Sequence, residues 1–532
     1  MLPTAALRTG QEAITLTEIE LKLTAAPGDL PALMQALEAL GKRTSATASL
    51  LTSTYYDSPD LKLQQRHLTL RVREQGAQYV QTVKSGDLME ADFISRGEWE
   101  DLITGNEPDL DAPQTGHRLK QKVEKGELRP LFTTIVRRTV IELEPVPSTR
   151  IEAAIDEGEI RSTDGKAVEP VSEIELELKS GDPVAIYDVA LQLLDIAPLR
   201  IETRSKAERG YALVAPDNRK PSAVHAKPLT LDAAMSVESM LQSIGRWCLV
   251  HILRNEPAVL ADQPEGIHQM RVAVRRLRSV LSALKPMLPS EHHRWTSDEL
   301  RRLARTLGPA RNWDVFATSL LEPVERALPL ERDLEHLAET AEQRRQAAHD
   351  VAKQAILTRQ HTTSVLKLAR WFEARGWRDQ PVSQHAALLL ASIGDIASGL
   401  IERRWRQSRK RSKRFDELTP SQRHKLRIAL KKLRYTIEFL RSLFDKSKVK
   451  AFMRLLTPLQ DDLGKINDVR TARELVTEVA RQANENRDAI ARAGGIVLGW
   501  HDRVLFEQEP RLRRHVRRLR RAKRFWPQER VA

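Results

Sequence analysis

The chain has 532 residues, of which 30 % are charged and 5 % aromatic, and its formal net charge is +14. This length suffices for two to four domains with sizeable cores, and the single cysteine, Cys248, excludes an intramolecular disulfide and favours a reducing compartment. There is no run of 18 apolar residues and the first residues lack an apolar signal segment, so we expect a cytoplasmic protein without a membrane partner.

Residues 14–213 are predicted to form mainly strands, because charged or polar residues alternate there with aliphatic ones. The predicted strands are 14–24, 50–57, 67–74, 78–84, 92–101, 131–143, 150–156 and 171–179. Helical periodicity occurs at 28–40, 116–125 and 182–194. Eight antiparallel strands that share one charged face predict closure into a tunnel or barrel with flanking helices.

Carboxylates form a stripe in the first and in the last of these strands. They are Glu18, Glu20, Glu173, Glu175 and Glu177. Because a strand points successive side chains to opposite faces, the carboxylates of each stripe share one face. A solvated sheet face would explain either stripe alone. Five carboxylates around one space favour instead a site for a hard divalent cation.

Cationic side chains recur with the same spacing between the two acidic stripes. They are Lys22, Arg71, Arg73, Lys84 and Arg138, and Glu98 and Glu100 form a further acidic pair. Charges of both signs at period two, strand after strand, favour a charged lumen over a sheet with an apolar core.

The order of the short motifs resembles that of the CYTH family of triphosphate tunnel metalloenzymes. Nine motifs occur in order, among them E-x-E-x-K, Tyr-Tyr-Asp at 55–57, I-D-E-G at 155–158 and S-K…R-G-Y at 205–211. The resemblance implies an eight-stranded tunnel that hydrolyses triphosphates with Mg²⁺ or Mn²⁺. Triphosphate hydrolysis needs charge neutralisation and an oriented water rather than a protein nucleophile.

The resemblance also implies roles for the charged residues. The implied metal ligands are Glu18, Glu20, Glu173, Glu175 and Glu177. The implied phosphate-binding residues are Lys22, Arg71, Arg73, Lys84, Arg138 and Lys206. Glu98 and Glu100 are either a second metal contact or anchors for the basic groups. Lys22, Glu175 and Glu177 are the candidate catalytic residues, and either glutamate is a candidate to accept the water proton.

Residues 216–229 contain three prolines and are predicted to be a linker. Residues 1–215 contain 25 Lys and Arg and 35 Asp and Glu, which gives a net charge of −10. The remaining residues contain 61 Lys and Arg and 37 Asp and Glu, which gives a net charge of +24. Opposite charge predicts two domains with different roles. We expect a first domain at 1–215 with its core at 14–213, an all-helical domain at 230–525, and a tail at 526–532.

The helical domain contains an internal repeat. H-Q-M-R-V-A-V-R-R-L-R at 268–278 matches H-K-L-R-I-A-L-K-K-L-R at 424–434, 156 residues later. Each copy is followed by Leu-Gly and then by a cluster of Asn and Asp. Two copies of one helical unit are predicted to pack about a pseudo-two-fold axis.

In each copy a histidine and three basic residues lie on one helical face. They are His268, Arg271, Arg275 and Arg278 in the first copy, and His424, Arg427, Lys431 and Arg434 in the second. A solvated face would explain one such helix. Like charges at these spacings repel, however, so their repetition favours an anion site. The faces lack aromatic residues for base stacking, so nucleic acid is not expected as the primary ligand.

This pattern resembles the CHAD domain, a helical module characterised by histidines, over about residues 232–520. The resemblance implies a basic channel that binds inorganic polyphosphate, lined by these eight residues and by others such as Arg301, Arg302, Arg305, Arg403 and Arg404. The whole chain is thus expected to be an inorganic triphosphatase that converts tripolyphosphate to pyrophosphate and phosphate. Thiamine triphosphatase, class IV-type adenylate cyclase and a non-catalytic polyphosphate- or nucleic-acid-binding protein are the alternatives.

Overall fold

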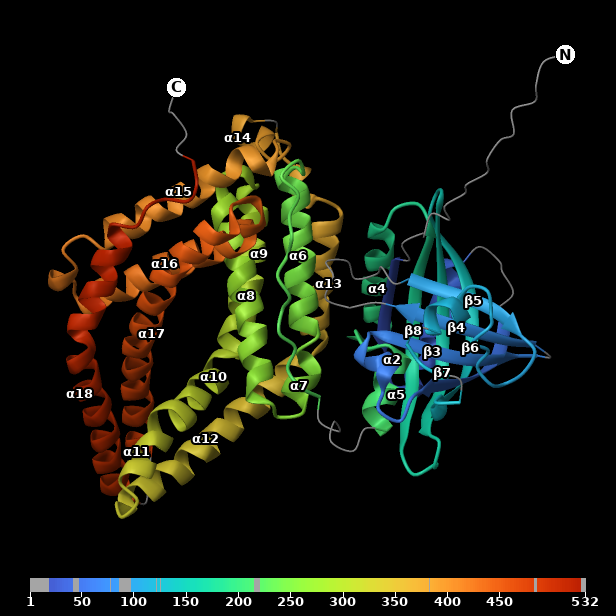
Figure 1. The fold of residues 1–532 in the computed structure, drawn as a ribbon, viewed down its shortest axis with the longest axis horizontal. Helices are drawn as coiled ribbons and strands as arrows, with labels where there is room; N and C mark the ends of the chain where they lie inside the picture. Colours follow the sequence, from blue (N-terminus) through green and yellow to red (C-terminus); the bar gives the residue numbers. More distant parts are fainter. Residues whose placement is uncertain are drawn as a thin grey trace. The chain divides into compact units, whose positions relative to one another are not determined.

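The computed structural model describes residues 19–41, 47–76, 78–85, 97–120, 122–124, 126–214, 221–381, 383–482 and 486–527. The chain divides into two compact units, one formed essentially by the residues before 217 and one by those that follow. The first unit, blue to green in Figure 1, is built on a sheet, and the second, green to red, consists of helices.

The described residues form one sheet of nine strands in the order β5-β4-β3-β2-β6-β7-β8-β1-β9, and the first unit holds β1 to β8. The strands are β1 (Ile19–Thr24), β2 (Thr47–Asp57), β3 (Leu68–Gln75), β4 (Gln78–Ser85), β5 (Gly97–Ile103), β6 (Arg129–Val146), β7 (Thr149–Ser162), β8 (Val168–Ser180) and β9 (Arg200–Ile201). The eight predicted strands are confirmed within the described residues, and the neighbours from β5 through to β1 pair antiparallel.

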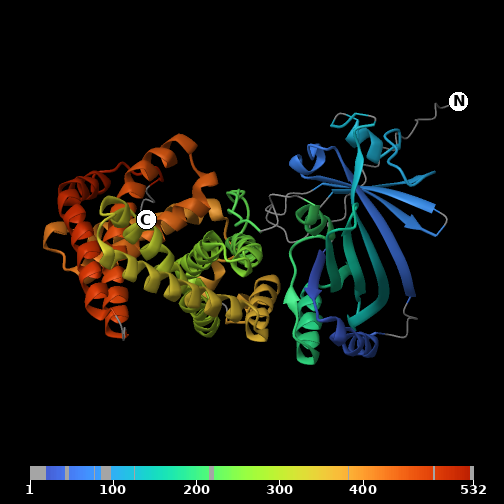
Figure 2. The same ribbon diagram turned by 90° about the horizontal axis from the view of Figure 1, so that it is seen from below.

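The prediction of eight strands closed into a barrel is wrong in two respects. A ninth strand, β9, extends the sheet beyond β1, and its two residues are too few to show any periodicity in the sequence. The sheet is also open, since among the described strands β5 and β9 are its edges and do not pair. Closure needs two edge strands that can lie side by side, and β9 is much shorter than β5. The long strands β6 and β7 nevertheless curve strongly, as the teal ribbons in Figure 2 show.

Apolar residues on one face of the sheet form a core with two helices. Leu21 and Leu23 of β1 are buried, as are Leu33 and Leu37 of α1 (Leu30–Leu40). The second helix is α4 (Val184–Ile196), and it contacts both α1 and β1. The charged residues that alternate with these leucines therefore lie on the opposite face, which we call the inner face.

A short helix, α5 (Lys206–Val214), packs against β6, β7 and β8. Gly210 allows the close approach, because a Cβ atom there would lie 2.1 Å from the ring of Phe132. Tyr211 packs edge-on against Phe132, and its hydroxyl donates to the fully buried Asp57 at 3.0 Å. These contacts fix the helix whose first residue is Lys206. The sequence did not predict α5, and the predicted helix at 116–125 is reduced to α3 (Thr115–Leu119).

The second unit is helical throughout its described part. Its longer helices are α6 (Val237–Leu253), α8 (Pro264–Leu284), α9 (Ser290–Thr306), α10 (Gly308–Val315), α12 (Arg332–Ile356), α13 (Arg359–Glu373), α15 (Ile393–Arg411), α16 (Pro420–Leu440), α17 (Lys446–Gln482) and α18 (Arg487–Arg520). Figure 1 shows α17 beside α18 and α10 beside α12.

The predicted repeat extends over most of this unit. Helices α8 and α16 each have 21 residues, begin at prolines 156 positions apart and contact each other. Helices α6 and α15 begin with the same offset, as do α9 and α17. The copies differ where α9 ends at Thr306 and α10 begins at Gly308, since α17 continues over the matching residues. The pseudo-two-fold axis itself stays a prediction.

No helix in the described part of the chain is both long enough and apolar enough to cross a bilayer.

Candidate active site and basic cavity

The register of the sheet places acidic and basic residues side by side on the inner face. Lys22 of β1 lies opposite Glu175 of β8, and Glu20 lies opposite Glu177. One step further, Arg138 of β6 pairs with Asp156 of β7, which pairs with Glu173 of β8. Residues that are distant in the sequence thus meet on four adjacent strands.

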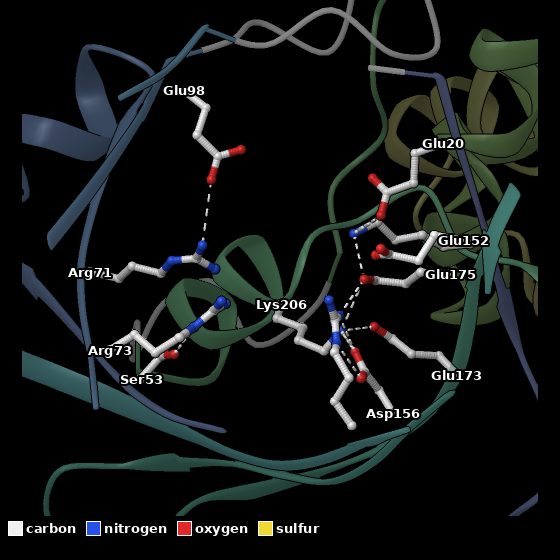
Figure 3. A network of polar contacts seen from close by, with 12 residues as sticks. Glu20, Ser53, Arg71, Arg73, Glu98, Glu152, Asp156, Glu173, Glu175 and Lys206 are labelled. Carbon is white, nitrogen blue, oxygen red and sulfur yellow. Dashed lines mark hydrogen bonds and ion pairs between the residues drawn. The ribbon is translucent and has the colours of Figure 1, made fainter. Parts of the chain in front are cut away.

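Three of these carboxylates form what we call the acidic cluster: Asp156, Glu173 and Glu175. One oxygen from each lies within 4.8 Å of the others, and all three side chains are buried. The ammonium group of Lys206 lies among them, 2.6 Å from Asp156 Oδ2, 3.0 Å from Glu175 Oε1 and in contact with Glu173 (Figure 3). A lysine therefore already occupies the position that a cation would take in this cluster.

Further cations compensate the acidic cluster. Lys22 Nζ donates to Glu175 Oε1 at 2.7 Å, and Arg138 donates to Asp156 at 2.7 Å and also contacts Glu175. Arg209 of α5 donates to Glu173 Oε2 at 2.9 Å.

This compensation decides the charge state of the acidic cluster. Burial disfavours the charged form of Glu175, but Lys206, Lys22 and Arg138 outweigh it and hold the pKa of Glu175 well below its usual range. Burial likewise opposes the charge of Lys206, yet the carboxylates raise its pKa. Glu175 and Lys206 are therefore both ionised at neutral pH, and Glu175 is a weak base.

The opposite wall of the inner face carries excess positive charge. It consists of Arg71, Arg73 and Lys84, which we call the basic wall, and Figure 3 shows Arg71 and Arg73 directed toward the acidic cluster across an open space. Glu98 accepts from Lys84 at 2.6 Å and from Arg71 at 3.4 Å.

Arg73 has no such carboxylate contact among the described residues, and its Nε donates to Ser53 Oγ at 3.1 Å. Burial and the adjacent Arg71 lower the pKa of Arg73 to about 10. The buried Nε of Arg71 has no partner in the described part of the chain. The basic wall can therefore bind an anion.

The carboxylates nearest the edge of the inner face have fewer cationic partners and are partly exposed. Glu20 lies 3.1 Å from Lys22 Nζ, and Glu177 lies 2.8 Å from Lys179 Nζ. Glu152 of β7, opposite Glu177, is 3.6 Å from Lys179. The side chains of Glu20, Glu177 and Glu152 keep 27–31 % of their surface exposed. Carboxylate oxygens are the ligands that a hard divalent cation prefers, but among the described residues the acidic cluster alone brings three of them within 4.8 Å of one another, and Lys206 fills it.

The structure gathers most of the predicted residues on the inner face. Glu100 of β5 lies 3.7 Å from Arg71, and Glu18 lies outside the described residues. Three charged residues of the inner face were not predicted to belong to the site: Asp156, Glu152 and Arg209. Asp156 stands within the I-D-E-G motif and Arg209 within the S-K…R-G-Y motif, so a signal was present for both, although no helical periodicity marked the segment that carries Arg209.

In the helical unit, all eight residues of the two basic faces line one cavity of about 1150 Å³, which we call the basic cavity. Thirteen Lys and Arg residues and three Asp and Glu residues form its lining. The additional cations include Arg276, Arg301, Arg311, Lys432, Lys465 and Arg470, and the carboxylates are Glu438, Asp461 and Asp468. Such an excess of positive charge attracts a polyanion.

Several cations of the basic cavity are incompletely hydrogen-bonded. The buried Nε atoms of Arg271, Arg275 and Arg427 have no partner among the described residues. Burial and the neighbouring Arg275 lower the pKa of Arg271 to about 10, and burial and Arg311 lower that of His268 to about 4. Glu438, by contrast, outweighs burial and raises the pKa of Arg434.

Residues from the Asn/Asp clusters complete the cavity wall. His424 Nδ1 lies 3.1 Å from Asn467 Oδ1, so this amide orients the ring. Of the further arginines named from the sequence, Arg301 lines the cavity, while Arg302 binds Glu299 and Ser364. Arg404 is buried and donates to Ser282 Oγ at 3.1 Å.

Two domain families match this chain. Residues 16–211 match the CYTH domain and residues 243–477 match the CHAD domain. The chain therefore contains a CYTH domain, which includes the sheet and its inner face, followed by a CHAD domain, which includes the basic cavity.

Individual relatives match parts of the chain. It is 32 % identical to the inorganic triphosphatase of Haemophilus influenzae over 205 residues, which are 38 % of this chain and 56 % of that protein. An uncharacterised protein of Mycobacterium tuberculosis is 26 % identical over 288 residues, 51 % of this chain and 52 % of that protein. The chain thus spans little more than half the length of these relatives.

Among solved structures, the CHAD domain from the plant Ricinus communis matches 57 % of this chain and 99 % of its own length, with 29 % identity and a TM-score of 0.50.

Proposed function

We propose that this protein is a metal-dependent inorganic triphosphatase that cleaves tripolyphosphate to pyrophosphate and phosphate on the inner face of its CYTH domain. The observation that carries the proposal is that the basic wall and the acidic cluster face each other on the inner face. The basic wall carries positive charge that carboxylates do not fully neutralise. The opposite part of the inner face carries carboxylates, such as Glu20 and Glu177, together with further cations. A triphosphate bound to a divalent cation has the matching distribution of charge. The similarity to the Haemophilus inorganic triphosphatase supports the same substrate class.

Each charged group has a part in this reaction. The phosphate oxygens are bound on one side by the basic wall, Arg71, Arg73 and Lys84. On the other side, the cations that can turn toward the triphosphate are Lys22, Arg138 and Lys206. Glu20 and Glu177 would hold Mg²⁺ or Mn²⁺, which supplies positive charge beside the phosphate when bound.

The proton of the attacking water needs an acceptor on the same side. Of the two candidates, Glu177 suits this role better than Glu175, because three cations keep the pKa of Glu175 low. Neither glutamate needs to form a covalent bond to phosphorus.

The CHAD domain is proposed to hold inorganic polyphosphate in the basic cavity. The domain limits at 215 and 230, and a location in the cytoplasm, belong to the same proposal. The single thiol of Cys248 is consistent with that location, since burial raises its pKa to about 12 and leaves it unreactive.

The test is phosphate release by the full chain from tripolyphosphate with Mg²⁺, with Mn²⁺ and with excess EDTA. We expect turnover with either metal and less than 1 % of it with EDTA. Thiamine triphosphate and ATP are compared under the same conditions. Preferred hydrolysis of thiamine triphosphate, or formation of cyclic AMP from ATP, would replace the proposal by one of the alternative chemistries.

A non-catalytic protein that binds polyphosphate or RNA is the second candidate. No turnover of any triphosphate, together with retained polyanion binding, would favour it. Competition between polyphosphate and single-stranded RNA for the full chain then identifies the ligand, and RNA binding would weaken steeply with salt.

A further inference from the structure

The two basic faces of the cavity differ at one of their four matched positions. His268, Arg271 and Arg278 correspond to His424, Arg427 and Arg434, 156 residues later. The remaining pair is Arg275 in α8 and Lys431 in α16. A guanidinium stays protonated at every physiological pH, whereas a lysine in a suitable environment can lose its proton. The second face therefore has a titratable group where the first has a permanent charge.

The surroundings of Lys431 disfavour its charge. Arg427 precedes it by one turn of α16, and Arg271 and Arg275 belong to α8, which packs against α16. Asp468 of α17 is the carboxylate among the described groups that act most strongly on it. Burial, followed by Arg427 and Arg275, lowers the pKa of Lys431 to about 7.

Neighbouring groups do not offset this effect. Burial raises the pKa of Asp468, and the attraction of this carboxylate for the Lys431 charge is smaller than the combined effect of burial, Arg427 and Arg275. Helix α15, on the other side of α16, places Arg404 near Lys432, and that also adds positive charge.

We propose that the basic cavity takes up a proton together with its polyanion, that Lys431 is the group that accepts it, and that affinity for the polyanion therefore falls as pH rises above neutrality. This inference rests on the proposed polyphosphate binding by the CHAD domain. A bound phosphate chain neutralises Arg271, Arg275 and Arg427, so the charged form of Lys431 becomes favourable again. Binding and protonation are then linked.

The sign and size of the effect follow from this linkage. Above pH 7 the free cavity increasingly holds a neutral Lys431, while the complex holds a charged one, so binding must include the uptake of a proton. With a pKa of about 7 in the free protein and an ordinary lysine value of about 10.4 in the complex, the Kd rises roughly 70-fold between pH 7.5 and 9.5. The inner phosphates of the chain remain ionised over this range. His268, with a pKa of about 4, titrates below it when the cavity is free.

The experiment is calorimetric titration of the full chain with long-chain sodium polyphosphate, in EDTA so that hydrolysis does not consume the ligand. Measurements at pH 8 in two buffers of different ionisation enthalpy give the number of protons taken up, for which we expect about 0.9. Kd values at pH 7.5 and 9.5 give the fold-change.

Lys431→Arg is the decisive variant, because it makes the second face match the first. We expect proton uptake near zero and a Kd that changes less than threefold over the same range. The double variant Arg275→Lys/Lys431→Arg moves the titratable amine to the matched position and should restore much of the dependence. Lys410→Arg, on the exposed side of α15, is the control and should behave like the wild type.

The outcomes separate this inference from the proposed function. Tight binding whose pH dependence is unchanged in Lys431→Arg would overturn the role of Lys431 and leave polyphosphate binding intact. Absence of polyphosphate binding by the wild type at every pH would overturn the function proposed for the CHAD domain and, with it, the proton uptake.

Discussion

Replacing Lys206 by methionine is expected to destabilise the CYTH domain and to turn its acidic cluster into a cation site. The ammonium group contacts Asp156, Glu173 and Glu175, whose side chains are 0 %, 1 % and 10 % exposed. Methionine fills similar space but brings no charge. The three carboxylates would then share fewer cations in a buried environment.

The magnitude follows from the cost of uncompensated buried charge. Removing one partner of a buried ion pair costs about 3–5 kcal/mol. Each carboxylate keeps another cation, because Arg138 contacts Asp156 and Glu175, and Arg209 binds Glu173. We therefore expect the lower end, about 3 kcal/mol. For a domain of this size that corresponds to a decrease of roughly 6–12 °C in Tm.

The pH dependence has a definite sign. The depressed pKa of Glu175 stabilises the wild type at neutral pH, and this stabilisation is lost as pH falls below the usual carboxyl range toward the folded-state value. Lys206→Met lacks the part of this stabilisation that the Lys206 ammonium group provides. The difference in Tm between wild type and Lys206→Met is therefore largest near pH 7 and becomes smaller in acid.

Differential scanning calorimetry with and without Mn²⁺ measures both effects. A Mn²⁺ concentration of 100 Kd should restore about 2.7 kcal/mol in Lys206→Met, and it should stabilise the wild type less. Lys166→Met, at an 85 % exposed side chain 3.8 Å from Asp164, is the control and should change stability by less than about 0.5 kcal/mol. A Lys206→Met protein that melts within 1–2 °C of the wild type, with an equal response to Mn²⁺, would refute the compensation of the acidic cluster.

Three further predictions concern other parts of the chain. Arg73→Gln should lower kcat/KM for tripolyphosphate about 10- to 100-fold, because a charge-assisted hydrogen bond contributes about 1.5–3 kcal/mol; initial rates measure this, and an unchanged value would remove Arg73 from the site. The double reversal Arg271→Glu/Arg427→Glu should weaken polyphosphate binding at least 100-fold in calorimetry. The control Arg518→Glu, on the exposed side of α18, should change the affinity less than threefold. Equal losses in both variants would indicate a diffuse effect of net charge. Gly499→Ala should raise the free energy of unfolding by up to about 1 kcal/mol, since a Cβ at this helical position meets nothing within 4 Å, and a lower value from urea titration would contradict that.

The sequence predicted the elements that carry the charged residues because their patterns are local. Alternation in E-I-E-L-E-L defines a strand with one acidic face wherever that strand lies, and the helical spacing from His268 to Arg278 defines a basic face in the same way. The repeat indicated that a second such face exists. It could not indicate that α8 and α16 enclose one cavity, since that depends on how the helices pack.

What the sequence determined by itself was the chemical inventory: which strands carry carboxylates, which carry cations, and that two helices repeat one basic pattern. The tertiary structure decided which of these charges are already neutralised. Lys206 and Asp156 are 50 residues apart and belong to a helix and a strand, so no local pattern could show that their side chains meet. The same holds for the open edge at β9 and for the arginines around Lys431, because charge compensation depends on distance in space, which only the packed chain fixes.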